Sequence, residues 1–176
     1  MRNITIKQYV ELKDRTEYDI LDFLKPTKAF GSYEMSINDM TYTEVKTVAK
    51  RLREFKGWDD IVFVFTTCFN ITEEQFYNGK ILDFFSAKKY VVKYFQDLLQ
   101  KESKLLSSIS IDSAKWIAAG GDKLNRFSDI LPINQLGKIY GIYPFELGNY
   151  KYFEIITLLT IEKEQNEIER RMHEMK

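Results

Sequence analysis

Residues 69–95, FNITEEQFYNGKILDFFSAKKYVVKYF, decide the fold class because they predict two successive helices. Thr72 and Gln75 have capping-box spacing, in which each side chain satisfies a free backbone N–H at the start of a helix. Asn78-Gly79 is a typical helix end, since glycine often follows a helix C-terminus. The segment is therefore expected to form a short capped helix, a turn and a longer helix.

The longer helix, opened by Asp83 or Ser86, is amphipathic. Its apolar residues recur at helical spacing, and lysines and other polar residues occupy the opposite side, which predicts one core-facing stripe. The stripe consists of Val91, Val92, Tyr94, Phe95, Leu98, Leu99, Leu105 and Leu106.

Helix signals also dominate the N-terminal part of the chain. One helix is expected to begin at Thr5 and a shorter one at Thr16. The second should stop before Pro26, because a residue that precedes proline disfavours the α conformation. Residues 27–40 are interpreted as a connector, with room for a short strand around residues 33–37.

A further capping box, Thr41 and Glu44, predicts a helix that runs to Gly57. The segment after it, residues 60–69, is ambiguous. Its run of Ile, Val and Phe is typical of a buried strand, but a fully buried helix has the same pattern. Because helices surround the segment, we favour a helix.

Prolines and glycines punctuate the second half of the chain. Residues 107–112 are interpreted as a polar linker, and a short helix through Trp116 should end at Gly120-Gly121. The next helix is bracketed by Pro132 in its first turn and by Gly141 just after its end.

From about Asn149 a final helix is expected, apolar nearly all round at first and then charged except for a narrow seam. The predicted fold class is therefore mainly α, with at most one short strand or extended connector. Residues 1–150 are expected to form one compact multi-helix domain. In the C-terminal helix, residues 151–176, the apolar first half should pack on the domain and the charged second half is free to protrude.

The composition excludes several classes of function. The chain has 26 Lys+Arg and 26 Asp+Glu, and this zero formal charge is not that of a non-specific nucleic-acid binder. One Cys and one His argue against disulfides, zinc and His-rich metal clusters, so no metal or cofactor is expected. No apolar run approaches the ~20 residues that a membrane-spanning helix needs.

No pattern points to catalysis. The paired acids Asp59-Asp60 and Glu73-Glu74 fit helix first turns, where carboxylates complement the helix dipole. Gly120-Gly121-Asp122-Lys123 lacks the spacing of a phosphate-binding loop. Cys68 lies inside an apolar run and is interpreted as a buried hydrophobe. The sequence therefore predicts a protein that is not an enzyme.

A basic stretch and a heptad seam are the candidate binding sites. Lys46, Lys50 and Arg53 share one helix face, which predicts either a phosphate contact or an ordinary solvated surface. The residues of the seam recur at spacings of three and four. This pattern favours either packing of the helix along the chain's own domain or an interface between the helix and another subunit. It consists of Leu158, Ile161, Gln165, Ile168, Met172 and Met175.

Three stretches give the chain a likeness to known proteins. They are Ile4-Thr5-Ile6-Lys7-Gln8-Tyr9 at the start, residues 69–95, and residues 136–159, LGKIYGIYPFELGNYKYFEIITLL. In this order the chain resembles small helical proteins from the virion and tail-assembly gene clusters of tailed bacteriophages. Each motif is mostly helix punctuation, and it is their succession along nearly the whole chain that carries the resemblance.

The resemblance implies a non-enzymatic structural protein of a phage virion, such as a ring or adaptor subunit near the portal–tail junction. Its expected partners are portal or tail components and further copies of itself, with neither nucleic acid nor membrane among them. Its expected locations are the virion and, during assembly, the cytoplasm of the bacterial host. Two alternatives stay open: a tail-assembly chaperone absent from the mature particle, and a helical nucleic-acid-binding or regulatory protein.

Overall fold

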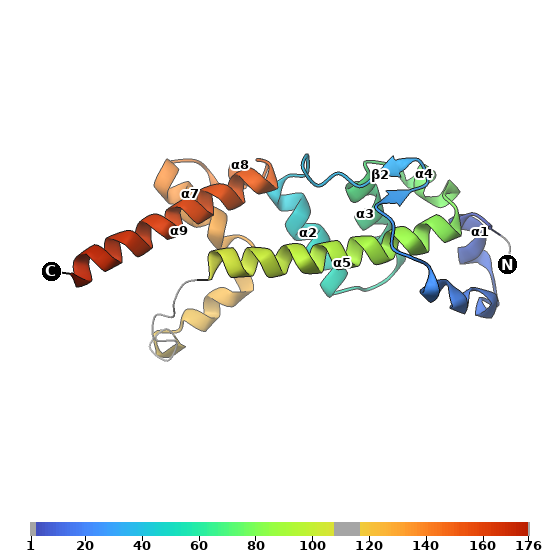
Figure 1. The fold of residues 1–176 in the computed structure, drawn as a ribbon, viewed down its shortest axis with the longest axis horizontal. Coiled ribbons are helices and arrows are strands. Elements are labelled where there is room, and N and C mark those ends of the chain that lie inside the picture. The colour runs from blue at the N-terminus through green and yellow to red at the C-terminus, as the bar shows by residue number, and fades with distance from the viewer. Residues whose placement is uncertain (1–2, 108–116, 176) are drawn as a thin grey trace. The chain divides into compact units, whose positions relative to one another are not determined.

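A computed structural model describes residues 3–107 and 117–175 of the chain (Figure 1). These residues are mainly α-helical, with a two-stranded antiparallel hairpin and a long C-terminal helix, so the predicted fold class is confirmed. None of the described helices is both long enough and apolar enough to cross a lipid bilayer.

The chain forms two compact units. The first comprises Met1–Ile37 and Thr47–Leu98, and the second comprises Asn38–Lys46 and Leu99–Lys176. The division passes through helices α2 (Tyr42–Arg53) and α5 (Ile81–Leu106). The boundary expected at residue 150 does not coincide with this division, in which the C-terminal helix belongs to the second unit together with α7 (Leu131–Tyr140) and α8 (Pro144–Leu147).

Capping boxes start two helices of the first unit. In the predicted box, the backbone N–H of Gln75 donates to Thr72 Oγ1 over 3.2 Å and that of Thr72 donates to Gln75 Oε1 over 2.8 Å. Thr5 and Gln8 make the same reciprocal pair, although only Thr5 was expected as a helix start. Besides most of α5, the unit contains α1 (Ile6–Glu11), the 3-10 helix η1 (Thr16–Phe23), β1 (Ala29–Phe30), β2 (Tyr33–Glu34), α3 (Trp58–Phe69) and α4 (Glu73–Asn78).

Residues 60–69 are helical, as favoured, and lie within α3. Neither Asp59 nor Asp60 is the N-cap, which is Gly57. The Asp60 carboxylate instead accepts a hydrogen bond from the backbone N–H of Lys56 and one from Arg51. The helix expected from Thr16 is a 3-10 helix that ends at Phe23, before Pro26 as predicted, and Phe23 itself is exposed.

The core of the first unit is an aromatic cluster centred on Phe65 of α3. Its ring centroid lies 5.0 Å from that of Phe84 and 5.3 Å from those of Phe30, Phe69 and Phe76. All five rings are buried. Such pairs contribute about 0.5–1.5 kcal/mol each beyond the burial of their area. The cluster joins β1 to α3, α4 and α5, three helices that follow one another closely in the chain.

The second unit contains the beginning of α2 and the end of α5. Its other described elements are η2 (Gly121–Phe127), α7 (Leu131–Tyr140), α8 (Pro144–Leu147) and α9 (Tyr152–Glu174). Pro132 lies in the first turn of α7 and Gly141 ends it with a left-handed φ of 68°, both as predicted. The Thr41–Glu44 capping box is also present. The linker at 107–112 and the helix through Trp116 fall largely outside the described residues.

Gly79 is required because a side chain there would collide with the aromatic cluster. A Cβ atom at this position would lie 2.1 Å from Cζ of Phe30, whose ring is held by Phe65, Phe69 and Phe76. We expect Gly79→Ala to lower the free energy of unfolding by about 1–3 kcal/mol, the usual cost of overpacking. Urea denaturation measures this change. Gly57→Ala is the matched control, since a Cβ there meets nothing within 4 Å; an equal loss in both variants would contradict the prediction.

Because of Cys68 in α3, we expect the free energy of unfolding to fall as the pH rises above about 9. Burial raises the pKa of its thiol from 9.0 to about 12. Above pH 9 the unfolded chain therefore releases this proton while the folded chain keeps it, and stability falls by about 1.4 kcal/mol per pH unit. We expect the stability difference between the wild type and Cys68→Ala to shrink by about 1 kcal/mol from pH 9 to pH 10, less than the full slope because the unfolded thiol is only half ionised at pH 9. Urea titrations at both pH values measure it, and a constant difference would contradict the prediction.

Candidate protein–protein interface

The C-terminal helix α9 is anchored in the second unit by a buried ion pair. Glu102, near the end of α5, is only 9% exposed. One of its carboxylate oxygens pairs with Lys46 Nζ from α2, and the other accepts a hydrogen bond of 2.9 Å from Tyr152 Oη. Three elements that are distant in sequence, α2, α5 and α9, thus meet at one carboxylate.

Tyr42 completes this polar cluster. Its ring stacks on that of Tyr152 with centroids 6.2 Å apart, and its hydroxyl donates to the Asp129 carbonyl over 3.4 Å. Burial, and then the negative charges of Glu102 and Asp129, raise the pKa of Tyr42 well above its usual range. Among the described residues no buried side-chain nitrogen or oxygen lacks a hydrogen-bond partner. A buried cluster with satisfied polar groups is suited to holding helices together.

The two halves of α9 differ as the sequence predicts. The first half buries Tyr152, Ile155, Ile156 and Leu159. Beyond them the same face becomes polar: Lys163 Nζ donates to the Leu105 carbonyl over 3.0 Å and lies 3.7 Å from Glu167. Glu167 in turn lies 3.5 Å from Arg171. This side of α9 is therefore held to its own unit first by apolar packing and then by charged contacts.

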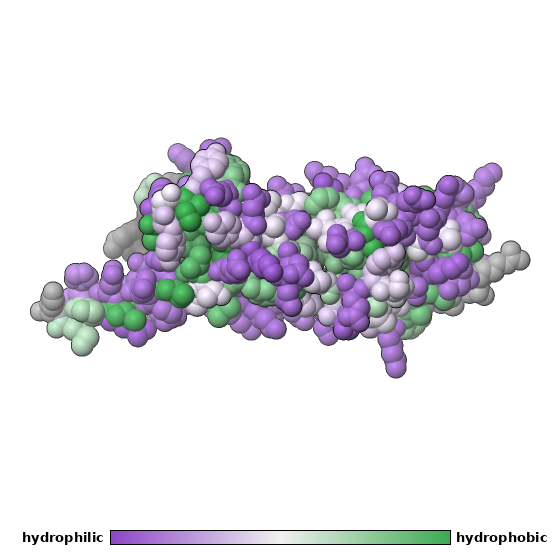
Figure 2. All heavy atoms as spheres, turned by 90° about the horizontal axis from the view of Figure 1, so that it is seen from above, coloured by the Kyte–Doolittle hydropathy of each residue, from purple (hydrophilic) through white to green (hydrophobic). Residues whose placement is uncertain are grey.

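The heptad seam of α9 is exposed to solvent over most of its length. The exposed fractions are 45% for Ile161, 53% for Ile168, 60% for Met172 and 83% for Met175. Gln165 is also exposed, and only Leu158, next to the buried half of the helix, is half-buried. Figure 2 shows apolar residues interrupting the hydrophilic surface at the C-terminal end of α9, at the left of the view. The seam is thus an apolar stripe that no other segment of the described chain covers.

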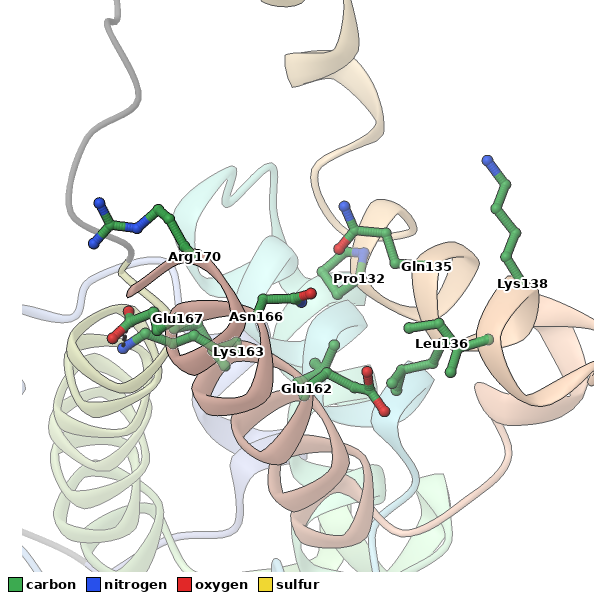
Figure 3. Close-up of a pocket in the computed structure, with 12 residues that line it drawn as sticks. Pro132, Gln135, Leu136, Lys138, Glu162, Lys163, Asn166, Glu167 and Arg170 are labelled. Atoms are coloured by element: carbon green, nitrogen blue, oxygen red, sulfur yellow. Dashed lines mark ion pairs between the residues drawn. The ribbon is translucent and has the colours of Figure 1, made fainter. Parts of the chain in front are cut away.

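A cleft of about 800 Å³ separates α9 from α7 (Figure 3). Asn166 of α9 extends toward Pro132 and Gln135 of α7 across it, and the ion pair between Lys163 and Glu167 closes the side next to α5. Its lining combines apolar and charged side chains. The lining residues are Leu106, Pro132, Gln135, Leu136, Lys138, Ile139, Leu159, Glu162, Lys163, Asn166, Glu167 and Arg170.

The seam and the cleft lie on opposite sides of α9. Each residue turns an α-helix by about 100°. The cleft-lining residues of α9, from Leu159 to Arg170, therefore cluster about half a turn away from Ile161, Ile168 and Met172. Contacts within the second unit fix the first side of the helix and leave the second side free for another molecule.

Exposed aromatic residues at the α7–α8 corner are a feature that sequence reasoning missed. Tyr143 and Phe145 are both exposed, and their ring centroids lie 5.5 Å apart. Nearby in sequence, Ile139 and Tyr140 are exposed too, and Tyr140 Oη donates to Glu162 over 2.7 Å. The signal that could have revealed the exposure of Tyr143 and Phe145 is Pro144, which starts α8 between them and so places both residues where α7 and α8 meet.

The basic stretch of α2 does not form one open patch: neither the phosphate contact nor the solvated surface fits Lys46, which is paired with Glu102. Lys46 is largely buried in its ion pair with Glu102, and its Nζ lies 5.3 Å from the centre of the Tyr42 ring. Lys50 and Arg53 are exposed, and Arg53 lies 3.5 Å from Glu54. The expected face is interrupted at Lys46 because this residue, whose position in the sequence suggests exposure, pairs with Glu102, a buried acid of α5.

The remaining side chains form no metal site: within residues 3–107 and 117–175, no three His, Cys, Asp or Glu side chains converge so as to hold a metal ion. His173 lies on the exposed end of α9.

No protein-family model, curated protein or solved structure matches the chain. The interface candidate therefore depends on the exposed seam and on the anchoring of the helix that carries it.

The anchor predicts a large and specific loss of stability. Lys46→Met should lower the free energy of unfolding by about 3–5 kcal/mol, because it leaves Glu102 charged and buried without its cation. Lys50→Met, an exposed position on the same helix, should change it by less than about 0.5 kcal/mol. Chemical denaturation compares the two. Adding Glu102→Leu to Lys46→Met should recover part of the loss, and equal effects of the two single variants would contradict the anchoring role.

Proposed function

We propose that the protein is a non-enzymatic assembly subunit that binds a neighbouring protein through the seam of α9. The observation that carries the proposal is the exposure of Ile161, Ile168 and Met172 on a helix whose opposite side is fixed. Apolar side chains at this spacing are what helices bury against each other in coiled coils. Solvent exposure of such a stripe is costly unless a partner covers it.

We further propose that the setting is a tailed bacteriophage, with the chain as a ring or adaptor subunit near the portal–tail junction. This part of the proposal is supported by the resemblance carried by residues 4–9, 69–95 and 136–159. A ring subunit also contacts copies of itself, and the exposed aromatic residues Tyr143 and Phe145 suit such a contact, because aromatic side chains are enriched at interfaces.

A tail-assembly chaperone is the second candidate, because it too needs an exposed apolar helix face. The distinction lies in where the protein is found. Mass spectrometry of purified mature particles should detect the chain at a stoichiometry that matches other neck or tail proteins. Absence from particles, with abundance in infected cells, would favour the chaperone. If the chain's source carries no phage, both versions of the proposal are wrong.

Charged residues placed in the seam should abolish the association of the protein with its partner without unfolding the protein. In Ile161→Asp with Ile168→Asp, both changes lie at exposed positions, so the free energy of unfolding should change by less than about 0.5 kcal/mol per site. Incorporation of the variant into particles, or its binding to the tail protein that it escorts, should fall below detection. Quantitative mass spectrometry and circular dichroism measure the two properties.

The matched control is Phe23→Asp with Phe55→Asp, which makes the same chemical change at two exposed apolar residues of the first unit. Its incorporation should remain that of the wild type. If the seam variant is also incorporated normally, the seam is not the interface.

A further inference from the structure

We infer that the seam of α9 binds a helix of a different protein, one that carries Lys or Arg beside its apolar positions, and not a second copy of this chain. The inference rests on the proposed function and adds the chemistry of the partner. The charges that flank the exposed apolar residues define this partner.

The seam is bordered mainly by carboxylates. In the heptad that Ile161 and Ile168 define, the flanking positions on one side are Glu162 and Glu169, and on the other side Glu164 and Arg171. Glu164 and Glu169 are exposed and make no ion pair in the described part of the chain. Residues at these positions face the flanking residues of the partner helix and determine which partner is accepted.

Parallel pairing with a second copy places like charges opposite each other. In a parallel coiled coil, the flanking residue before one apolar position faces the flanking residue five places further on in the other helix. Glu164 of each copy would then face Glu169 of the other, and this repulsion would occur twice. The parallel arrangement therefore disfavours self-association.

Antiparallel pairing does not remove the repulsion. With the two seams fully overlapped, Glu164 faces Arg171 of the second copy, but Glu162 faces Glu169, and each contact occurs twice. The attractive contacts are weakened further because Arg171 already lies 3.5 Å from Glu167 of its own helix. Repulsion at Glu162 and Glu169 thus opposes whatever the arginine contributes.

A helix with basic flanks matches the three carboxylates and leaves Arg171, which already lies 3.5 Å from Glu167 of its own helix, as the one like charge. Its Lys or Arg residues would meet the exposed Glu164 and Glu169, and the half-buried Glu162 at the border of the cleft, which also accepts the hydrogen bond from Tyr140. Its apolar residues would cover Ile161, Ile168 and Met172. From Ile161 to Met175 the seam is about 21 Å long, or two heptads. A free helix of that length is marginal in water, so the partner helix must be stabilised by its own protein.

Disulfide exchange at the seam tests the charge preference directly. Gln165→Cys places a thiol at the centre of the exposed stripe, and the buried native Cys68 leaves it as the reactive one. The variant is equilibrated in a glutathione buffer with two synthetic three-heptad peptides, each with Leu at the apolar positions and Cys at a central one. The first peptide has Lys at every flanking position, and the second has Glu. Tethering raises the effective concentration enough to detect a short interface.

We expect the Lys peptide to be captured about tenfold more than the Glu peptide at low salt, because three flanking carboxylates attract the first peptide and repel the second, while only Arg171 acts in the opposite sense. The ratio should fall as salt shortens the range of the charges. Adding Glu164→Lys and Glu169→Lys should remove or reverse the preference. Glu11→Lys with Glu74→Lys, which reverses two exposed carboxylates of the first unit, should leave it unchanged.

Equal capture of the two peptides, a preference for the Glu peptide, or formation of the Gln165→Cys homodimer in preference to both would overturn the inference. The proposed function would survive those outcomes, because the seam would still be an interface. Capture of the Lys peptide that does not respond to Ile161→Asp with Ile168→Asp, together with normal incorporation of that variant into particles, would instead show that the seam itself was wrongly chosen.

Discussion

The ion pair between Lys46 and Glu102, joined by the hydroxyl of Tyr152, is the contact on which the second unit depends. It brings α2, α5 and α9 to one buried carboxylate. A carboxylate in such a place is tolerated only when cations and hydrogen-bond donors surround it, because its removal from water costs several kcal/mol. The pair therefore specifies the arrangement of these helices: another register of α9 would leave Glu102 without its tyrosine.

The same contact explains how one helix serves both the core and the surface. Tyr152 fixes the beginning of α9, Lys163 and Glu167 continue the attachment on the same side, and Ile161 and Ile168 are turned away from it. The helix is long enough to extend past the apolar residues that bury its first half. Most of the exposed large apolar residues of the described chain belong to the second unit, and many of them lie in α7, α8 and α9. That concentration makes this unit the natural place for partners.

Local signals predicted the elements well and their surroundings less well. The capping boxes at Thr41 and Thr72 and the glycine after α7 formed as expected, because each depends on atoms only a few residues apart. Lys46 was wrongly placed on an open basic face, and the exposure of Tyr143 and Phe145 was missed. Both errors concern what a side chain meets, which depends on residues distant in sequence. The seam itself was predicted from its spacing, but its exposure was one of two open alternatives.

The sequence by itself determined the helical fold class, the start and end of most helices, and the apolar spacing of Leu158 to Met175, because helix caps and periodicity are local properties. Only the tertiary structure decided that residues 60–69 join an aromatic core around Phe65, that Lys46 neutralises Glu102, and that the seam of α9 faces solvent. The physical reason is that burial is a property of the whole chain. A residue's neighbours in sequence define the face of the helix it occupies, whereas its neighbours in space decide whether that face is covered.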